Sequence, residues 1–296
     1  MVRSVTFGDR VITCVLYVIV IFLAIICLLP ILNTLAVSFS GSTMAASGTV
    51  TFIPKDFSVE AYRAIMGDAQ FYKSALISVK RVILGGTINF IFTVLSAFPL
   101  SRNSKQFIGR GFYMALFVFC MIFTSSIVPT YIVVSRMGLM NSIWALILPG
   151  AVPIWNCILL MNFFRGISKE LEEAAFIDGA QPYQVLFKIF LPISLPGLAT
   201  VTLFSLVGHW NEFFHGMIYM NSSSKYPLAT YISTIVNSTK DLTQVTDPKE
   251  LERLMKTSDT TLNSAKIFIS MVPILVVYPF MQRYFVTGLV MGSVKE

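Results

Sequence analysis

Long apolar runs alternate with shorter polar stretches along most of the chain. Six of the runs approach or exceed the roughly 20 residues that an α-helix needs to cross a bilayer. They predict membrane spans at residues 11–35, 71–100, 111–134, 143–164, 195–220 and 265–285. The pattern therefore predicts an all-α, polytopic membrane protein, with a single transmembrane domain over residues 1–296.

Prolines and glycines inside the runs predict where the spans depart from isolated straight helices. Pro129 predicts a kink in the third span. Pro149 and Pro153 share the fourth span and predict a bent or broken helix, which needs neighbours or water to satisfy the freed backbone groups. The pair Gly85-Gly86 in the second span predicts a close approach by another helix, because small residues let two backbones come together.

The segment 168–192 carries helix signals but cannot lie in hydrocarbon. Its first half contains Glu170, Glu172, Glu173 and Asp178, and each such charge costs several kcal/mol in a membrane. Apolar runs flank it on both sides. We therefore expect this segment to be held at the membrane surface between the fourth and fifth spans.

Within this segment the residue order predicts two helices joined by a tight turn. Ser168 suits an N-cap, and Gly179 suits the left-handed conformation that ends a helix. Pro182 fits the first turn of a second helix, and Pro192 is expected to end it. The apolar face of that second helix is made by Val185, Leu186, Ile189 and Phe190.

An even number of spans places both termini and the 168–192 hairpin on one face of the membrane. That face includes a short basic loop with Arg102, Lys105 and Arg110. Basic residues in short loops favour the cytoplasmic side. The sequence therefore predicts that the hairpin and both termini are cytoplasmic.

Composition agrees with a membrane protein and argues against several other classes. The chain is 55% hydrophobic and 12% charged, against about 25% charged in a soluble domain. Its net charge of +7 comes from basic residues scattered through loops, so it indicates topology rather than nucleic-acid binding. The four cysteines and two histidines lack the spacing of a metal site, and no catalytic constellation or phosphate-binding loop is present. If ATP drives the protein, another polypeptide must bind it.

Polar residues in the fifth span are the candidates for a functional site. Trp210, Asn211 and Glu212 lie there beside His209 and His215, and an ionisable residue inside a membrane suggests function. One interpretation is a pathway in which Trp210 offers a ring face to a passing solute. The other is a polar clamp between helices, in which Glu212 could pair with His209.

Three asparagines elsewhere in the apolar runs are weaker candidates for a functional site. Asn89, Asn156 and Asn162 suit hydrogen bonds between helices better than contacts with a transported molecule. Of these, Asn156 is kept as a possible pathway residue.

The order Glu173-Ala174-Ala175, Asp178-Gly179-Ala180, then Ile189 and Leu191-Pro192 resembles the EAA loop of ABC-importer permeases. The resemblance extends over nearly the whole chain and is nearest to the second permease subunit of carbohydrate importers that handle oligosaccharides. This nearer match is carried by residues 50–62, 210–214 (Trp-Asn-Glu-Phe-Phe), 226–228 (Tyr-Pro-Leu) and 278–295.

The resemblance implies a set of partners and a mechanism. The residues implied to couple the chain to an ATPase are Glu173, Ala174, Ala175, Asp178, Gly179, Ile189, Leu191 and Pro192. Two ATPase subunits would bind ATP and Mg, a homologous second permease would complete a heterodimer, and an external solute-binding protein would deliver an oligosaccharide. The chain itself would be a transport subunit of the bacterial cytoplasmic membrane and no enzyme.

Two alternatives remain at this point. The chain could be an ABC permease for a solute other than a sugar, since the EAA loop is shared across importers. An ion-coupled secondary transporter would need carboxylates in its spans, of which Glu212 is the one candidate, and inverted repeats are not evident.

Overall fold

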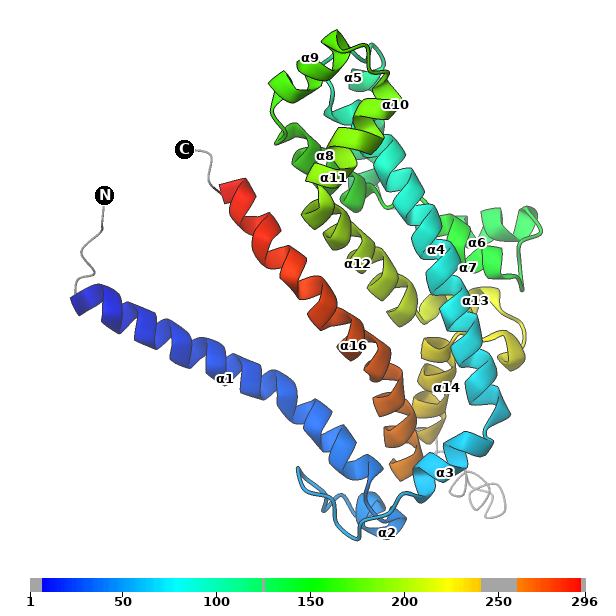
Figure 1. Ribbon diagram of the computed structural model, residues 1–296. Coiled ribbons are helices and arrows are strands. Elements are labelled where there is room, and N and C mark those ends of the chain that lie inside the picture. Colours follow the sequence, from blue (N-terminus) through cyan, green and yellow to red (C-terminus); the bar gives the residue numbers. More distant parts are fainter. Residues whose placement is uncertain (1–6, 124–125, 241–259, 294–296) are drawn as a thin grey trace. The chain divides into compact units, whose positions relative to one another are not determined.

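The described part of the chain is almost entirely helical (Figure 1). The computed structural model describes residues 7–123, 126–240 and 260–293. Among these residues, the extended pairing is limited to one isolated antiparallel bridge between Ser40 and Phe57. The all-α prediction is confirmed, and its physical reason is that a helix satisfies its own backbone hydrogen bonds inside lipid.

In the part of the chain that the structure describes, three helices are long and apolar enough to cross a membrane by themselves. They are α1 (Phe7–Ser38), α4 (Ala69–Ser101) and α16 (Thr260–Ser293). Three bent helix pairs pass the same test of length and composition together, so the described residues offer up to six spans if each pair crosses once. The pairs are α5 (Arg110–Ile122) with α6 (Ile127–Arg136), α7 and η1 (Ile143–Ile147, Leu148–Gly150) with α8 (Ile154–Arg165), and the segment Pro182–Ile193 with α12 (Leu195–Asn211).

The remaining helices are short or polar. They are α2 (Ser42–Ala46), α3 (Glu60–Gly67), α9 (Lys169–Ile177), α10 (Pro182–Val185), the π turn η2 (Leu186–Phe190), α11 (Leu191–Ile193), α13 (Phe214–Tyr219), η3 (Ser223–Lys225) and α14 (Leu228–Lys240).

Prolines break the spans at some of the expected places. In the fourth span, α7 with η1 and α8 meet at an angle of 47°, which confirms the break predicted from Pro149 and Pro153. The kink predicted at Pro129 is wrong in position. α5 ends at Ile122 and α6 begins at Ile127, so Pro129 lies in the first turn of a new helix, where its missing N–H breaks no helical hydrogen bond. In the sixth span, α16 continues through both of its prolines.

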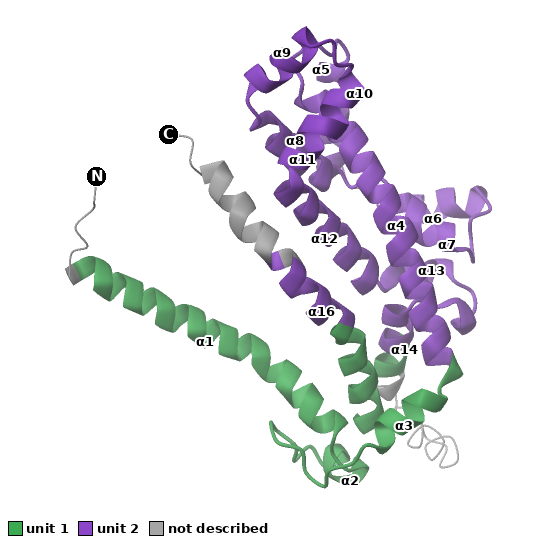
Figure 2. Cartoon of the chain, in the orientation of Figure 1, with its two compact units in different colours: residues 1–69, 234–272 green, residues 70–233, 273–296 purple. Residues whose placement is uncertain are grey.

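Contacts divide the chain into two compact units, residues 1–69 with 234–272 and residues 70–233 with 273–296 (Figure 2). In the first unit, Asn33 of α1 donates to the carbonyls of Val50 and Thr51 at 3.2 and 2.6 Å. Nζ of Lys266 lies 2.6 Å from Oδ2 of Asp68, and both side chains are largely buried. These contacts join the end of α1 to the loop that follows it, and the start of α16 to the end of α3.

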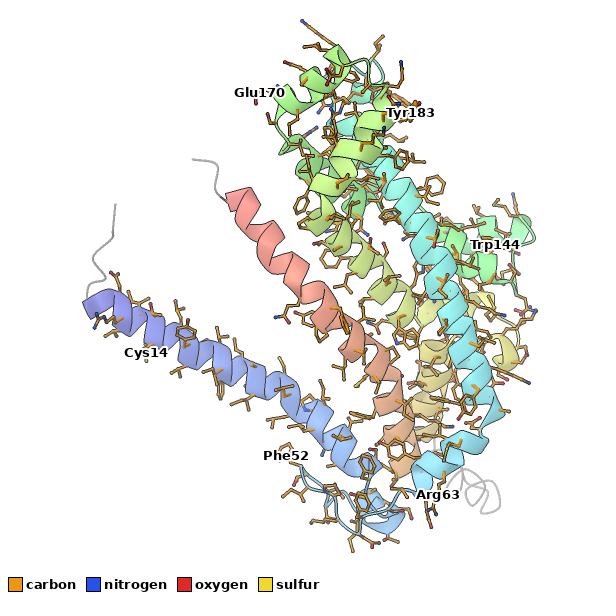
Figure 3. The ribbon with its side chains drawn as sticks, viewed as in Figure 1. Cys14, Phe52, Arg63, Trp144, Glu170 and Tyr183 are labelled. Carbon is orange, nitrogen blue, oxygen red and sulfur yellow. The ribbon has the colours of Figure 1, made fainter. Side chains whose placement is uncertain are left out.

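Most of α1 is exposed among the residues that the structure describes. None of its most apolar 18-residue window is buried, and Cys14 marks this exposed region in Figure 3. An apolar helix without protein around it requires lipid or another subunit.

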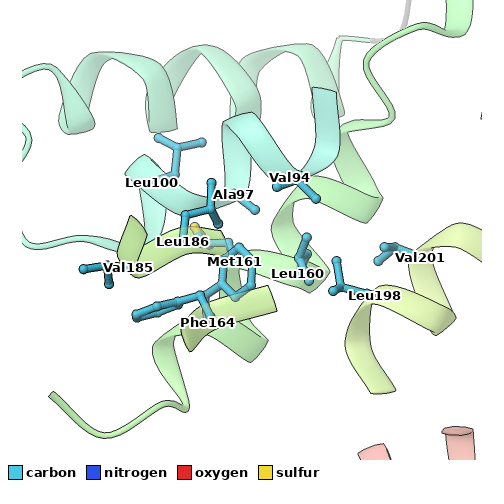
Figure 4. Packing of buried hydrophobic residues seen from close by; sticks show 11 residues of the cluster. Val94, Ala97, Leu100, Leu160, Met161, Phe164, Val185, Leu186, Leu198 and Val201 are labelled. Carbon is cyan, nitrogen blue, oxygen red and sulfur yellow. The ribbon is translucent and has the colours of Figure 1, made fainter. Parts of the chain in front are cut away.

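The core of the second unit packs α4, α8 and α12 against the segment Pro182–Ile193 (Figure 4). Its buried residues are Val94, Ala97, Leu100, Leu160, Met161, Phe164, Val185, Leu186, Phe190, Leu198 and Val201. The second helix of the 168–192 hairpin therefore buries its predicted apolar face against the spans. The candidate functional residues are built around this core.

Candidate functional site

Arg81 is a buried cation of α4 that holds three elements together. Its Nη1 donates to the Glu212 carbonyl at 2.8 Å, and its Nη2 donates to Oε2 of Glu212 at 2.7 Å and to the Leu146 carbonyl at 3.2 Å. The residue is 1% exposed. Burying an unpaired guanidinium costs several kcal/mol, and these three acceptors offset that cost. Arg81 therefore fixes α4 to α7 and to the end of α12.

The fifth span, predicted over residues 195–220, is interrupted at Glu212. α12 ends at Asn211, Glu212 is extended (φ −72°, ψ 114°), and α13 begins at Phe214. Helix ends leave backbone groups unbonded, and here side chains bond them. Arg81 donates to the Glu212 carbonyl, and Oε1 of Glu212 accepts the N–H of His215 at 2.8 Å.

Glu212 and His209 have different partners. Oε2 of Glu212 pairs with Arg81 and lies 3.4 Å from Nδ1 of His215. His209 is buried, and its Nε2 lies 3.4 Å from Oδ1 of Asn89 on α4. The structure therefore contains a polar clamp at this place, but Arg81 makes it in place of the considered His209–Glu212 pair.

The sequence analysis did not single out Arg81, which lies near the polar beginning of the second span. The sequence feature that could have identified Arg81 as a buried residue is the carboxylate of Glu212 in another span. A charge that cannot leave the membrane must find an opposite charge there, and Arg81 is the basic residue of α4 nearest to its apolar stretch.

α4 and α12 approach each other closely at a pair of glycines. A Cβ on Gly85 would lie 2.5 Å from Nε2 of His209, and one on Gly86 would lie 2.6 Å from Cδ2 of Leu206. Real Cβ atoms essentially never come so near another heavy atom. The close helix contact predicted from Gly85-Gly86 is confirmed.

The candidate pathway residues lie at the end of α12 and on α8. Trp210 is half-buried, Asn211 is exposed, and the Glu212 side chain is 27% exposed. Asn156 of α8 is buried, and its Nδ2 donates to the Val201 carbonyl at 3.2 Å and to Oγ of Ser205 at 3.0 Å. Asn156 therefore joins α8 to α12. Whether any of the four contacts a transported molecule stays a prediction.

The first helix and turn of the 168–192 hairpin follow the predicted local signals with one exception. Gly179 has φ +80°, and a Cβ there would meet no atom within 4 Å, so backbone conformation rather than space favours glycine. Pro182 begins α10, and Oε1 of Gln184 accepts the N–H of Gln181 at 2.8 Å. The exception is Ser168, which precedes α9 but whose hydroxyl bonds the carboxylate of Glu170 instead of a backbone N–H.

The second helix of the hairpin does not end at Pro192, contrary to the prediction. Helical structure continues to Ile193, Ser194 interrupts it, and α12 then leaves at an angle of 84°. A proline in a helix loses one hydrogen bond and crowds the carbonyl four residues before it. The wider π turn over Leu186–Phe190, directly before α11, allows the chain to continue past that point.

The residues implied to couple the hairpin to an ATPase divide into two sets. The exposed set is Glu173, Ala174, Asp178, Gly179 and Pro192. The partly buried set, packed against the core of the second unit, is Ala175, Ile189 and Leu191. Ala174 and not Ala175 therefore presents the small side chain to the outside.

Comparisons with known proteins identify the family of the chain. The family described as "Binding-protein-dependent transport system inner membrane component" matches residues 80–289. The chain is 38% identical to the "Polygalacturonan/rhamnogalacturonan transport system permease protein YtcP" of Bacillus subtilis, over 97% of this chain and 99% of that protein. It is 37% identical to Protein LplC of the same organism, over 91% and 90% of the two chains.

A solved structure shares both the fold and the extent of the chain. It is the crystal structure of a bacterial ABC transporter involved in the import of the acidic polysaccharide alginate. The likeness has a TM-score of 0.82 with 28% identity, and covers 95% of this chain and 98% of the other. The family match contains both the Arg81 clamp and the hairpin. The chain therefore belongs to the family of binding-protein-dependent transport system inner membrane components and is a permease subunit of an ABC importer.

Proposed function

We propose that this permease forms half of a pathway for an acidic oligosaccharide, delivered by an external solute-binding protein and driven by separate ATPase subunits. The observation that carries the proposal is the 38% identity to YtcP across nearly all of the chain. That protein is named for a galacturonan, which is a polymer of a uronic acid, and the transporter with a TM-score of 0.82 is named for an acidic polysaccharide.

The exposed surface of the hairpin supports docking of an ATPase subunit. Ile177, Tyr183 and Phe187 are 86%, 62% and 60% exposed, and Glu170 and Tyr183 mark this surface in Figure 3. Exposed apolar side chains rimmed by charges are typical of a protein interface. The exposed carboxylate of Glu173 and the small Ala174 fit a helix that enters a groove, with Glu173 setting its register.

The proposed cycle is one of alternating access. Closure of the ATPase dimer on ATP moves the hairpin, and the hairpin moves the spans that its second helix packs against. The pathway then opens toward the binding protein, and it opens toward the cytoplasm after hydrolysis. The exposed apolar surface of α1 is available for lipid and for the homologous second permease.

The test is uptake by proteoliposomes that contain the permease, the subunits that co-purify with it, and its solute-binding protein. An oligogalacturonide is compared with a neutral oligosaccharide of the same length. Uptake and stimulated ATP hydrolysis are expected with the acidic sugar and not with the neutral one. If the neutral sugar stimulated uptake and the acidic sugar did not, the proposal of an acidic substrate would be overturned. The proposal of an ATP-driven importer would stand.

The energy source is tested in intact cells. Uptake should continue when a protonophore removes the ion gradient and should stop when ATP is depleted. The opposite pattern would favour the ion-coupled alternative and overturn ATP-driven import.

A further inference from the structure

Arg102, directly after the end of α4, connects α4 with both helices of the hairpin. Its guanidinium forms an ion pair with Glu172 of α9. Its Cζ lies 4.2 Å from the ring centre of Phe190 in the π turn and 4.7 Å from that of Phe98 in α4. A planar guanidinium can stack face to face on aromatic rings while it donates hydrogen bonds from its edge, whereas a lysine ammonium has no planar face to stack.

The ion pair is a buried polar attachment of α9, beside the packing of Ala175 against the core. Glu172 is the buried residue of this helix, whereas Glu170 and Glu173 are exposed. The side chains of Arg102 and Glu172 are 11% and 9% exposed. Exposed ion pairs contribute little, but removal of one partner from a buried pair leaves the other charge without compensation. The second helix of the hairpin, by contrast, is held by apolar packing.

The Arg102–Glu172 ion pair lies between the well-held end of α4 and a polar cavity. Nε of Arg110 and Nη2 of Arg165 donate to the Leu100 carbonyl at 3.1 and 3.4 Å, which holds the end of α4 beside Arg102. A polar cavity of about 350 Å³ is lined by residues that include Arg102 and Glu172. On that side the ion pair, rather than packed side chains, joins α9 to the residue that follows α4.

We propose that Arg102 is the positioning residue that makes α9 move with α4, so that a displacement of the hairpin by the ATPase reaches the second span. This inference rests on the proposed function, because it requires the hairpin to receive motion from an ATPase. Arg102 acts through Glu172 and is not expected to touch the transported molecule.

The test measures coupling in the reconstituted complex with Arg102→Gln, Glu172→Gln and the double variant. Three quantities are compared: the ATPase retained on purification, the stimulated ATP hydrolysis, and the sugar imported per ATP hydrolysed. Each single variant should retain its ATPase but import about fivefold less sugar per ATP, the lower end of a typical coupling between sites. The double variant should be no worse than either single one, because residues that act through each other are not additive.

Two further variants separate positioning from a general effect of charge. Lys105→Gln removes an exposed cation from the same loop and should leave the ratio of sugar to ATP unchanged. Arg102→Lys keeps the charge but loses the stacking, and should restore part of the ratio.

An unchanged ratio in Arg102→Gln overturns the inference. Additive losses in the double variant, or a loss explained wholly by poorer retention of the ATPase, also overturn it. If the unaltered permease itself imports no sugar on ATP hydrolysis, the proposed function fails instead, whatever the variants do.

Discussion

Nη2 of Arg81 lies 2.7 Å from Oε2 of Glu212, although 131 positions separate the two residues in the sequence. The same guanidinium bonds the carbonyl of Glu212. One cation therefore neutralises a charge in the fifth span and also satisfies the open end of α12. The interruption of the fifth span depends on a residue of the second span.

The clamp predicts the effect of Glu212→Gln. Glutamine keeps the shape of the side chain and its acceptor oxygen, but the buried guanidinium loses its counter-ion. We expect a loss of about 3 kcal/mol in the free energy of unfolding, at the lower end for a buried pair because Glu212 is partly exposed. Thermal unfolding of the purified permease in detergent measures it. Glu60→Gln, at an exposed acid of α3, is the matched control, and equal unfolding temperatures for the two variants would contradict the clamp.

The contact between α4 and α12 predicts the effect of Gly85→Ala. The added methyl group would meet the ring of His209 at 2.5 Å, so the ring or the helices must shift at a cost of about 1–3 kcal/mol. The same detergent unfolding assay measures the change. Gly111→Ala in α5 is the control, since a Cβ there meets nothing within 4 Å, and similar behaviour of both variants would refute the close contact.

The pathway interpretation predicts that Trp210→Ala lowers transport more than it lowers assembly. Loss of an aromatic contact of roughly 1 kcal/mol corresponds to about a fivefold decrease in uptake. Uptake is measured alongside the amount of partner subunits that co-purify. Trp155→Ala, at an exposed tryptophan of α8, should leave uptake unchanged. If Trp210→Ala fails to assemble, Trp210 belongs to the clamp between helices and not to the pathway.

The turn of the hairpin predicts that Gly179→Val weakens binding of the ATPase and abolishes uptake. A side chain at φ +80° strains the backbone by roughly 1 kcal/mol or more. Gly48→Val is a matched control, because Gly48 has φ +68° and equally open surroundings outside the hairpin. Co-purification of the ATPase and stimulated ATP hydrolysis are the measurements. Equal activity of both variants would show that the hairpin is a surface feature without a coupling role.

The orientation predicts which positions an impermeant thiol reagent reaches in intact cells. In a background without the native cysteines, Ser104→Cys and Gln181→Cys should be shielded and Ser223→Cys should be labelled. All three side chains are exposed, so protection reports the side of the membrane and not burial. Labelling of Gln181→Cys from outside would overturn the orientation and the coupling role with it.

Local signals predicted those parts of the fold that neighbouring residues determine. Gly179 takes the left-handed conformation, Pro182 begins a helix, and Pro149 with Pro153 breaks the fourth span. Each of these depends on backbone geometry within a few residues. The close approach at Gly85-Gly86 was also predictable, because a missing side chain shows where space is required.

Local sequence signals could not predict which residues distant in the sequence contact each other. The end of α12 at Asn211 depends on Arg81, and the placement of α9 depends on Arg102. Neither partner is near its target in sequence, and periodicity says nothing about which buried charges meet. The continuation of the hairpin's second helix past Pro192 was not predicted for a similar reason. The π turn that precedes it cannot be recognised from the residue types alone.

Arg81 also has a consequence for how the protein is made. A growing chain enters the membrane from its N-terminal end, so Arg81 is present before Glu212, 131 residues later, has been synthesised. An arginine at the centre of an inserted helix costs roughly 3 kcal/mol on the insertion scale. Until the fifth span has been made, the guanidinium lacks the Glu212 carboxylate that offsets this cost. The Arg81–Glu212 pair can therefore form only in a late step of biogenesis.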